Sequence, residues 1–479
     1  MSEVVATAQQ GLAGKYHPYP EYKDSGVEWL GDMPNHWLTS KLRYMFTFGK
    51  GLTITKENLR DEGIPCVNYG EVHSKYGFEV DPTKHPLRCV EEDYLKTSSS
   101  SVLNVGDFVF ADTSEDIDGS GNFTQLTSDV VTFAGYHTII VRPIDKGSHR
   151  FFAYLFDSKE FRTAIRHAVK GVKVFSITQA ILRGADIWLP SQDERQRIAA
   201  FLDYETARID RLIAQQQRLI ELLKEKRQAV ISHAVTKGLN PDVPMKDSGV
   251  EWLGQVPEHW IVCRLKHIKS SQPNAFVDGP FGSNLKSEHF IENGDAYVIE
   301  SSFATTGSLD TSELKTITNE HFLTIKRSST NGGDIIIAKI GARFGSTAIL
   351  PVLDKPAVVS GNSLKLTVNA NAVHVEYVNH LLQHLKLEGA LDDGVNVTAQ
   401  PALSLGTLNN LCFVVPPLEE QQTVVAKISA KNNEYKRLIE QAETFVLLLK
   451  ERRTALISAA VTGKIDLRGW TQPAEEVAA

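Results

Sequence analysis

The sequence predicts an α/β protein made of two similar halves, each an α/β body followed by a long helix, related by an internal pseudo-two-fold repeat. The stretch KDSGVEWLG at 23–31 recurs letter for letter at 246–254, an offset of 223 residues (246 minus 23). LLKEKRQAVISHAVT, which starts at Leu222, returns as LLKERRTALISAAVT at Leu448, an offset of 226 (448 minus 222). Two copies of a long unit indicate a duplicated domain, because short-period solenoids need at least three repeats.

Length and composition indicate a soluble protein with several domains. With 479 residues the chain is too long for one core and fits two to four domains. No apolar run approaches the roughly 18 residues of a membrane span, and the N-terminus lacks a signal-peptide pattern. We therefore expect a cytoplasmic protein without a membrane partner. The four cysteines form no CxxC pair and the fifteen histidines show no ligand spacing, so no metal site is predicted.

The net charge of -7 leaves nucleic-acid binding open, because binding depends on where the basic groups cluster. The segment 161–176 contains four basic residues and no acidic one, namely Arg162, Arg166, Lys170 and Lys173. A solvated helix face is the alternative interpretation of this segment, and charge alone does not decide between the two.

The first long helix is predicted from Asp193 to about Ala234, between Pro190 and Gly238. Steps of four and three residues along it pass mostly through apolar side chains, as in a coiled-coil seam, and the second copy keeps this pattern. A helix of about forty residues is about 60 Å long and cannot bury such a stripe alone. We expect the two helices to form an antiparallel coiled coil; the alternative is that each packs on its own body. The predicted seam residues are Ile198, Leu202, Ile209, Leu212, Leu219, Leu223, Val230, Val424, Ile428, Tyr435, Leu438, Phe445, Leu449 and Leu456.

Each body is predicted to be α/β with many loops, because short apolar segments alternate with turn signals such as LNVGD and STNGGD. Helices are expected at Phe151–Ala168 and Val375–Gly389. Strands are expected at Val67–Tyr69, Asp107–Ala111, Thr138–Val141, Ile187–Leu189, Tyr297–Glu300, Asp334–Ala338, Ser363–Thr367 and Cys412–Val415.

The bodies contain no recognisable catalytic motif. The patterns GxxxxGK[ST], HExxH and GxSxG are absent, as is an NPPY-like motif of an amino-methyltransferase. This favours a binding protein. Two alternatives remain open: a self-contained DNA methyltransferase or nuclease with fused recognition domains, and an adaptor that bridges two proteins through its coiled coil without DNA.

The repeats resemble those of the specificity subunit of type I restriction-modification enzymes. The resemblance is based on the repeated KDSGVEWLG head with its P.HW ending, on LPSQDERQRIAAFLD at the first helix, and on PPLEEQQTVVAKI and LLKERRTALISAAVTGKI in the second copy. GPFGSNLKS at 279–287 is also similar to a stretch common in the recognition domains of that family. The resemblance covers the chain from about Tyr22 to Leu467.

This resemblance implies that each body is a target recognition domain that reads one half of a bipartite, asymmetric site in double-stranded DNA. The helices would fix the gap between the halves and dock two methyltransferase (modification) subunits, and restriction/translocase subunits would complete the complex. Those partners would use S-adenosylmethionine, ATP and Mg²⁺, while this chain would bind no cofactor and contribute no catalytic residue. The expected domains are 1–190 and 241–416 for recognition, 191–240 and 417–466 for the helices, and 467–479 for a flexible tail.

Side chains that can contact base edges or phosphates supply the candidate DNA contacts. Arg and Lys suit guanine, Asn and Gln suit adenine, and phosphate contacts outnumber base contacts. In the first body the candidates are Lys50, Thr53, Lys56, Asn68, Tyr69, Thr113, Lys170 and Lys173. In the second body they are Asn284, Lys286, Lys339, Arg343, Asn362 and Gln400. Lys170 and Lys173 align with Asp393 and Asn396, so this loop is not expected to make the same electrostatic contact in both copies.

Overall fold

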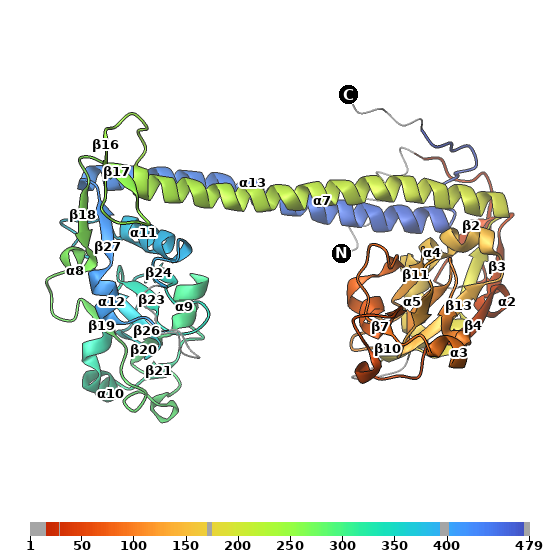
Figure 1. Ribbon diagram of the computed structural model, residues 1–479, viewed down its shortest axis with the longest axis horizontal. Coiled ribbons are helices and arrows are strands. Elements are labelled where there is room, and N and C mark those ends of the chain that lie inside the picture. The colour runs from red at the N-terminus through yellow and green to blue at the C-terminus, as the bar shows by residue number, and fades with distance from the viewer. Residues whose placement is uncertain (1–15, 28, 170–174, 393–401, 474–479) are drawn as a thin grey trace. The chain divides into compact units, whose positions relative to one another are not determined.

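The computed structural model describes residues 16–27, 29–169, 175–392 and 402–473 (Figure 1). The chain forms two compact units: unit 1 comprises Met1–Arg218 and Glu443–Ala479, and unit 2 comprises Leu219–Ala442. Two long helices, α7 (Gln192–Lys237) and α13 (Leu418–Val461), each contribute one part to unit 1 and the other part to unit 2. The chain therefore leaves unit 1 through α7 and returns to it through α13.

Unit 1 is built around two small sheets. The first has the order β4-β13-β9-β11-β6 and is antiparallel except for the β11–β6 pair. The second has the order β7-β5-β12-β8, with β5 and β12 parallel. The pairs β1-β2, β3-β15 and β10-β14 complete the unit. The strands are β1 (Tyr22–Asp24), β2 (Asp32–Pro34), β3 (Leu38–Lys41), β4 (Phe46–Lys50), β5 (Ile64–Val67), β6 (Phe78–Val80), β7 (Cys89–Val90), β8 (Val102–Leu103), β9 (Phe108–Ala111), β10 (Thr113–Ser114), β11 (Phe123–Leu126), β12 (Thr132–Ala134), β13 (Thr138–Pro143), β14 (Phe175–Ser176) and β15 (Asp186–Leu189).

Two helices, α4 (His149–Asp157) and α5 (Lys159–Ala168), cover the core of unit 1 where the sequence predicts a single helix. The chain leaves the helical conformation at Ser158, whose hydroxyl accepts a hydrogen bond from Phe161 N at 3.3 Å and so caps the new helix. Short helices α2 (Leu42–Met45), α3 (Tyr94–Thr97) and α6 (Gln179–Gly184) connect the strands. The core is filled by buried aromatic rings, among them Phe108, Phe110, Phe123, Phe151, Phe152 and Phe156.

Unit 2 has the same strand order, with four strands described in its first sheet, β19-β26-β23-β24. Its second sheet is β21-β20-β25-β22, and β16-β17 and β18-β27 pair as β1-β2 and β3-β15 do. The strands are β16 (Met245–Asp247), β17 (Gln255–Pro257), β18 (Ile261–Arg264), β19 (Phe276–Asp278), β20 (Ala296–Ile299), β21 (Thr316–Ile317), β22 (Ser329–Thr330), β23 (Ile335–Ala338), β24 (Thr347–Ile349), β25 (Ala357–Val359), β26 (Ser363–Leu366) and β27 (Cys412–Val415). The helices are α8 (Leu265–Ile268), α9 (Ser301–Thr306), α10 (Asn319–Thr324), α11 (Val375–Leu387) and α12 (Leu405–Asn410).

Most of the predicted strands coincide with observed ones, but the strand expected at Val67–Tyr69 lies earlier, as β5. Residues 68 and 69 instead lead into a helical turn, since Asn68 O accepts hydrogen bonds from Glu71 N and Val72 N at 3.1 and 3.2 Å. Tyr69 is therefore part of this helical turn and not of a strand.

The long helices bury a stripe that differs in part from the predicted seam. The predicted seam residues that recur at seven-residue intervals from Leu202 and from Ile428 are buried or half-buried, as Ile209 and Leu449 show. Four of the alternate positions are exposed, namely Leu212 (42%), Leu219 (43%), Leu438 (36%) and Phe445 (43%). The next residue in each case is half-buried or buried instead, namely Ile213, Ile220, Ile439 and Val446. The prediction was wrong at these four positions because each is the first of two adjacent apolar residues, and periodicity alone did not show which of the two faces inward.

Within unit 1 the two helices run in opposite directions. Trp188, just before α7, donates a hydrogen bond to Val461 O at the end of α13, and Asp210, further along α7, pairs at 3.0 Å with Arg453, which lies earlier in α13. The chain beyond α13 is also packed, since Leu467 is 2% exposed and the ring of Trp470 lies 5.5 Å from that of Phe201. The expectation of a flexible tail was therefore wrong for the residues up to Trp470.

Candidate nucleic-acid interface

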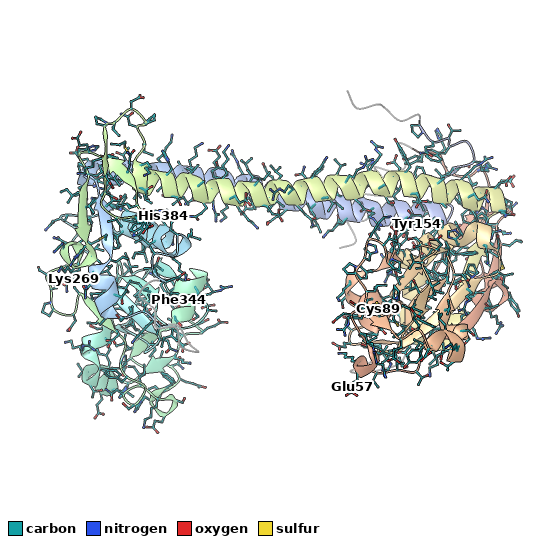
Figure 2. The ribbon with its side chains drawn as sticks, viewed as in Figure 1. Glu57, Cys89, Tyr154, Lys269, Phe344 and His384 are labelled. Carbon is teal, nitrogen blue, oxygen red and sulfur yellow. The ribbon has the colours of Figure 1, made fainter. Side chains whose placement is uncertain are left out.

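One edge of unit 1 gathers the loops that contain the candidate DNA contacts. We call it the unit 1 loop edge and define it as residues 50–58, 68–76, 112–122 and 135–138. Gly51 N donates to Thr138 O at 3.2 Å, Tyr69 N to Tyr136 O at 3.3 Å, and Asp112 N to His137 O at 3.1 Å. Figure 2 shows Glu57 of this edge at the end of unit 1 away from α7, whereas Tyr154, which donates to Asp203, lies beside α7.

Two glycines allow these segments to approach one another closely. A Cβ atom on Gly51 would lie 2.0 Å from Gly135 O, and one on Gly135 would lie 1.9 Å from Asn68 Oδ1. Any larger residue would push the loops apart. The unit 1 loop edge is thus a packed surface whose loops hold one another in place.

The described candidates of unit 1 do not all reach the surface. Lys50, Thr53 and Lys56 are exposed, and Tyr69 and Thr113 are half-buried. Asn68 is 1% exposed, and its side-chain amide donates to Cys66 O at 3.2 Å. Its side chain supports the loop, so the prediction that it contacts a base was wrong for this conformation. Lys170 and Lys173 lie outside the described residues.

The loop 112–122 gives the unit 1 loop edge an acidic character. It contains Asp112, Glu115, Asp116 and Asp118 and no Lys or Arg. Burial and, to a lesser extent, three of these carboxylates raise the pKa of the Tyr69 hydroxyl. Carboxylates can accept hydrogen bonds from cytosine N4 but repel phosphates. This loop is therefore suited to contacting base donors more than the backbone.

Two arginines of the predicted basic segment hold this acidic loop. Arg162 Nη1 donates to Asn122 Oδ1 at 2.8 Å, and Arg166 Nη1 lies 3.3 Å from Asp118 Oδ1. Both side chains are therefore engaged in contacts within unit 1.

Unit 2 gathers the corresponding loops in the same way. We define the unit 2 loop edge as residues 278–289, 339–346 and 360–363. Gly279 N donates to Ser363 O at 3.0 Å and Lys339 N to Asn362 O at 2.8 Å. A Cβ atom on Gly279 would lie 1.9 Å from Ser360 O. Gly279 thus corresponds to Gly51 of unit 1.

The unit 2 loop edge presents basic and amide groups to solvent. Four candidates are exposed, namely Asn284, Lys286, Arg343 and Asn362. Lys339 Nζ instead lies 3.3 Å from Asp278 Oδ2 and its side chain is 23% exposed, so it stabilises the edge. The loop 339–346 contains Lys339 and Arg343 and no acidic residue. Gln400 lies outside the described residues.

Two features of the unit 2 loop edge were missed by sequence reasoning. Phe281 is 75% exposed; it lies in GPFGSNLKS, the stretch that carries part of the family resemblance, but it was not named among the candidate contacts. His289 and His321 stack with ring centroids 3.9 Å apart, and His321 Nε2 lies 2.9 Å from Asn284 O. The pairing of these two histidines depends on tertiary contacts and had no sequence signal.

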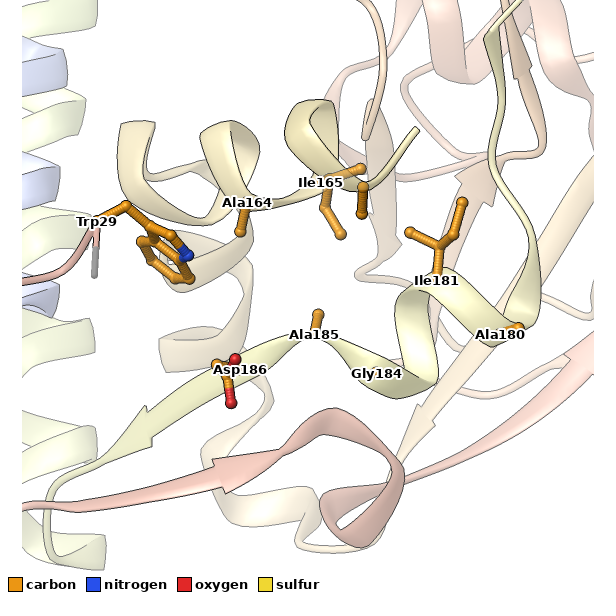
Figure 3. A pocket seen from close by; sticks show the side chains of 9 residues that line it. Trp29, Ala164, Ile165, Ala180, Ile181, Gly184, Ala185 and Asp186 are labelled. Carbon is orange, nitrogen blue, oxygen red and sulfur yellow. The ribbon is translucent and has the colours of Figure 1, made fainter. Parts of the chain in front are cut away.

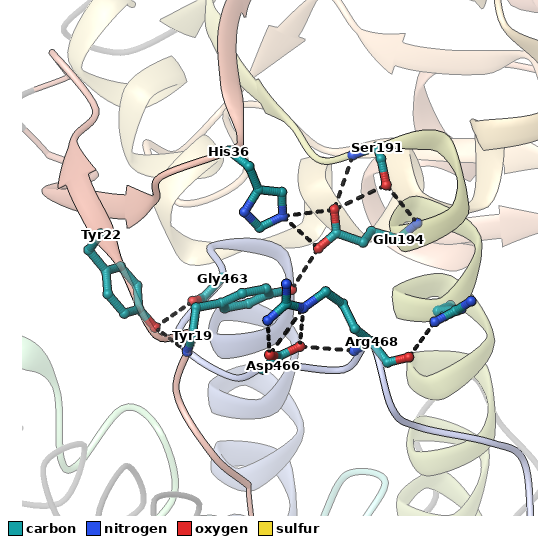
Figure 4. A network of polar contacts seen from close by, with 9 residues as sticks. Tyr19, Tyr22, His36, Ser191, Glu194, Gly463, Asp466 and Arg468 are labelled. Atoms are coloured by element: carbon teal, nitrogen blue, oxygen red, sulfur yellow. Dashed lines mark hydrogen bonds and ion pairs between the residues drawn. The ribbon is translucent and has the colours of Figure 1, made fainter.

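A buried carboxylate joins the first head to the start of α7 (Figure 4). His36 Nε2 lies 2.9 Å from Glu194 Oε1, and Tyr19 OH donates to the same oxygen at 3.2 Å. Ser191 and Glu194 form a capping box, with Ser191 N donating to Glu194 Oε2 and Glu194 N donating to Ser191 Oγ, each at 3.3 Å. Burial raises the pKa of Glu194, but hydrogen bonds from His36 and Ser191 outweigh it and leave this pKa below its usual value. Burial also raises the pKa of Tyr19.

The second head is joined to α13 by an equivalent carboxylate. His259 Nε2 lies 2.8 Å from Glu420 Oε2, and Trp260 Nε1 donates to Glu420 Oε1 at 3.1 Å. The Glu420 side chain is 31% exposed, whereas that of Glu194 is 8% exposed. The repeated head therefore has a structural role in both units, which is to fix the body to the first turn of a long helix.

A pocket of about 290 Å³ lies beside the first head (Figure 3). It is lined by Trp29, Ala164, Ile165, Ala168, Ala180, Ile181, Gly184, Ala185 and Asp186. Asp186 is the one charged lining residue, and its carboxylate pairs with Lys41 Nζ at 2.6 Å. The pocket therefore presents a mainly apolar wall, and its charged group is already paired.

Comparison with known proteins identifies the family. The family described as "Type I restriction modification DNA specificity domain" matches residues 34–222 and 282–443. This chain belongs to that family. It is 21% identical over 406 residues to the type I restriction enzyme StySPI specificity subunit of Salmonella potsdam, covering 83% of this chain and 82% of that protein. It is 25% identical over 289 residues to the EcoBI specificity subunit of Escherichia coli, covering 59% of each.

The fold of this specificity-domain protein is also similar to a solved one. A chain solved in work on complex assembly and conformational transition of the type I R-M system matches with a TM-score of 0.68 and 17% identity, covering 90% of this chain and 99% of that one.

Within the described residues, no group of three or more His, Cys, Asp or Glu side chains is arranged to hold a metal ion. No described helix has both the length and the apolar character needed to cross a bilayer.

Proposed function

We propose that this chain is the DNA sequence-recognition subunit of a type I restriction-modification complex, in which unit 1 and unit 2 each read one half of a bipartite, asymmetric site. The observation that supports this most strongly is the shared strand order of two units with unlike loop edges, in a chain of the specificity-domain family. Two unlike half-sites require two readers, and a common framework can present different loops to each half.

The long helices are proposed to form an antiparallel coiled coil that sets the gap between half-sites and docks two modification subunits. Support comes from their lengths of 46 and 44 residues and from their contribution to both units. The exposed residues Leu212, Leu219, Leu438 and Phe445 support docking, because apolar side chains on an exposed helical face are available to partner helices. The internal repeat then has a reason, since two copies of one partner need two similar docks.

The chemistry of the complex belongs to the partners in this proposal. Modification subunits carry S-adenosylmethionine and methylate adenine, and restriction/translocase subunits use ATP and Mg²⁺. This chain contributes base-edge and phosphate contacts that select where the partners act. It binds no cofactor itself.

Methylome sequencing of cells that express the chain with its modification subunit tests the proposal. The expected result is adenine methylation on both strands of a bipartite motif with a fixed gap. The purified chain without the modification subunit should show no methyl transfer from S-adenosylmethionine. Methyl transfer by the chain alone, or methylation without a sequence motif, would contradict the proposal.

Replacement of one body tests whether the units read independently. Exchanging residues 38–189 for the body of another family member should change one half-site and leave the other unchanged, because the flanking head and helix contacts are kept. The matched control exchanges residues 261–415 and should change the opposite half. Base substitutions within one half should cost about 1–3 kcal/mol per position. A single exchange that altered both halves would show that the units are coupled.

A further inference from the structure

Phe281 is more exposed than any other aromatic side chain in the part of the chain that the structure describes. Its exposed fraction is 75%, compared with 64% for Tyr44 and 43% for Phe445. An exposed phenylalanine ring contributes no hydrophobic stabilisation to the fold, because it stays in contact with water. Apolar groups on a polar surface often mark a binding site. Phe281 lies on the unit 2 loop edge, among side chains that suit DNA.

The backbone around Phe281 is held in one conformation. Gly279 N donates to Ser363 O at 3.0 Å, and the close approach of Gly279 to Ser360 O leaves no room for a side chain. A Cβ atom on Gly361 would lie 2.8 Å from Pro280 O. The turn after Phe281 is closed by a hydrogen bond from Asn284 N to Phe281 O at 2.7 Å.

The far side of this turn is fixed by the stacked histidines. His321 Nε2 lies 2.9 Å from Asn284 O, and Lys286 N donates to His289 Nδ1 at 2.9 Å. Both histidines therefore contact the loop that carries Phe281. An aromatic ring that is exposed on a fixed loop is preorganised for a ligand, because little backbone freedom remains to be lost on binding.

The chemistry around Phe281 favours a nucleic acid. Asn284, Lys286, Arg343 and Asn362 are exposed on the same loop edge, and the loop 339–346 has two basic residues and no acidic one. Proteins that combine basic and amide groups with an apolar ring use the ring to stack on bases or to enter a base step.

We infer that Phe281 is a DNA-contacting residue that stacks on a base or base step of the half-site read by unit 2. The inference rests on the proposed function and adds a specific residue and contact to it. Unit 1 has no aromatic residue at the corresponding position. Gly51 and Gly279 make equivalent hydrogen bonds, to Thr138 O and Ser363 O, and the residue two positions later is Thr53 in one unit and Phe281 in the other.

The test measures DNA binding by the full chain assembled with its modification subunits, using a duplex that contains the methylated motif. Phe281→Ala should weaken binding roughly tenfold to a hundredfold, which corresponds to the loss of one stacked base. Phe281→Trp should bind within about threefold of the unchanged complex, because it keeps a ring that can stack. The slope of log K against log salt should not change, since an apolar contact releases no counterions.

Matched variants and a local probe separate this contact from general effects. Tyr44→Ala, at a 64% exposed tyrosine of α2, and Leu323→Ala, at a 56% exposed leucine of α10, should each change the affinity less than threefold. 2-Aminopurine placed along the half-site of unit 2 should report altered stacking at one step, and Phe281→Ala should remove that signal. The same probe in the half-site of unit 1 should be unaffected.

Two results would overturn the inference while leaving the proposed function intact: an affinity of Phe281→Ala within twofold of the unchanged complex, or an equal loss on DNA that lacks the motif. A wild-type complex with no preference for any sequence would instead contradict the proposed function itself.

Discussion

Unit 1 and unit 2 share a framework and differ at the edge that we propose contacts DNA. Their sheets have the same strand order, and each is joined to a long helix by a histidine–glutamate pair. Yet the loop 112–122 contains four carboxylates, whereas the corresponding loop 339–346 contains two basic residues and no acidic one. The backbone contacts that position these loops are similar, so the framework does not constrain the charge of the loops. This independence allows one fold to read two different sequences.

One turn of the framework shows how closely the two units correspond. The carboxylates of Asp107 and Asp334 each accept a hydrogen bond at 2.9 Å from the backbone N–H three residues earlier. Gly106 and Gly333 precede them with φ values of 89° and 90°. The cation differs, because Arg142 pairs with Asp107 at 3.0 Å and Lys365 pairs with Asp334 at 3.4 Å. The turn is thus common to both units while its partner is not.

The largest expected effect comes from insertions after Arg218 in α7. These insertions test whether the helices set the gap between half-sites independently of the half-site sequences. Two inserted residues turn the helix by about 200°, which moves its apolar stripe away from α13 and should abolish methylation. Seven residues turn it by about 700°, within about 20° of two full turns, and lengthen it by roughly 10 Å. Because DNA rises about 3.4 Å per base pair, the gap should grow by one to three base pairs while both half-sites stay the same. Methylome sequencing measures this.

An active seven-residue insertion with an unchanged gap would show that the helices dock partners without setting the spacing. A change in either half-site would show that the helices also influence base reading.

Removal of the turn carboxylate should affect unit 2 more than unit 1. Asp334→Ala leaves Lys365, which is 7% exposed, buried without its partner, a change that typically costs 3–5 kcal/mol. Asp107→Ala should cost less, about 1–3 kcal/mol. Arg142 is 24% exposed and keeps hydrogen bonds to Ser100 O and Val102 O. Thermal unfolding of the full chain measures the destabilisation by each variant. Equal losses of stability would show that the different cations, Arg142 and Lys365, do not make the two turns unequal.

Substitution of the head carboxylates Glu194 and Glu420 should also destabilise the two units unequally, but by smaller amounts. Glu194→Gln should lower the free energy of unfolding by about 1–3 kcal/mol, because it weakens charged hydrogen bonds to a nearly buried group. Glu420→Gln, at a side chain that is 31% exposed, should cost less. Since the folded pKa of Glu194 is lowered, its contribution is present above the unfolded value of about 4.3 and is lost as pH falls through the folded value. In unfolding measured against pH, Glu194→Gln should remove this acid-sensitive part, and an unchanged profile would contradict it.

The smallest stability effects distinguish the two faces of α7. Ile213→Ala should destabilise unit 1 by about 1–2 kcal/mol, because Ile213 packs against its core. Leu212→Ala should change stability by less than about 0.5 kcal/mol, since Leu212 is 42% exposed. If the outer face docks a modification subunit, Leu212→Ala should instead weaken that association, which a titration of one subunit into the other measures. A larger loss of stability for Leu212→Ala than for Ile213→Ala would restore the seam predicted from the sequence.

The sequence by itself determined the duplication, the two long helices and the absence of recognisable catalytic motifs, because repeats and helical periodicity are local properties that can be read along the chain. It could not decide which residue of the pair Leu212-Ile213 faces inward, since both fit an apolar stripe. Only the tertiary structure showed that Asn68 is internal and that Arg162 and Arg166 hold an acidic loop. It also assembled each loop edge, because close contacts such as that of Gly51 with Gly135 join segments far apart in the chain. Such contacts depend on the packing of the whole unit, which leaves no periodic trace in the sequence.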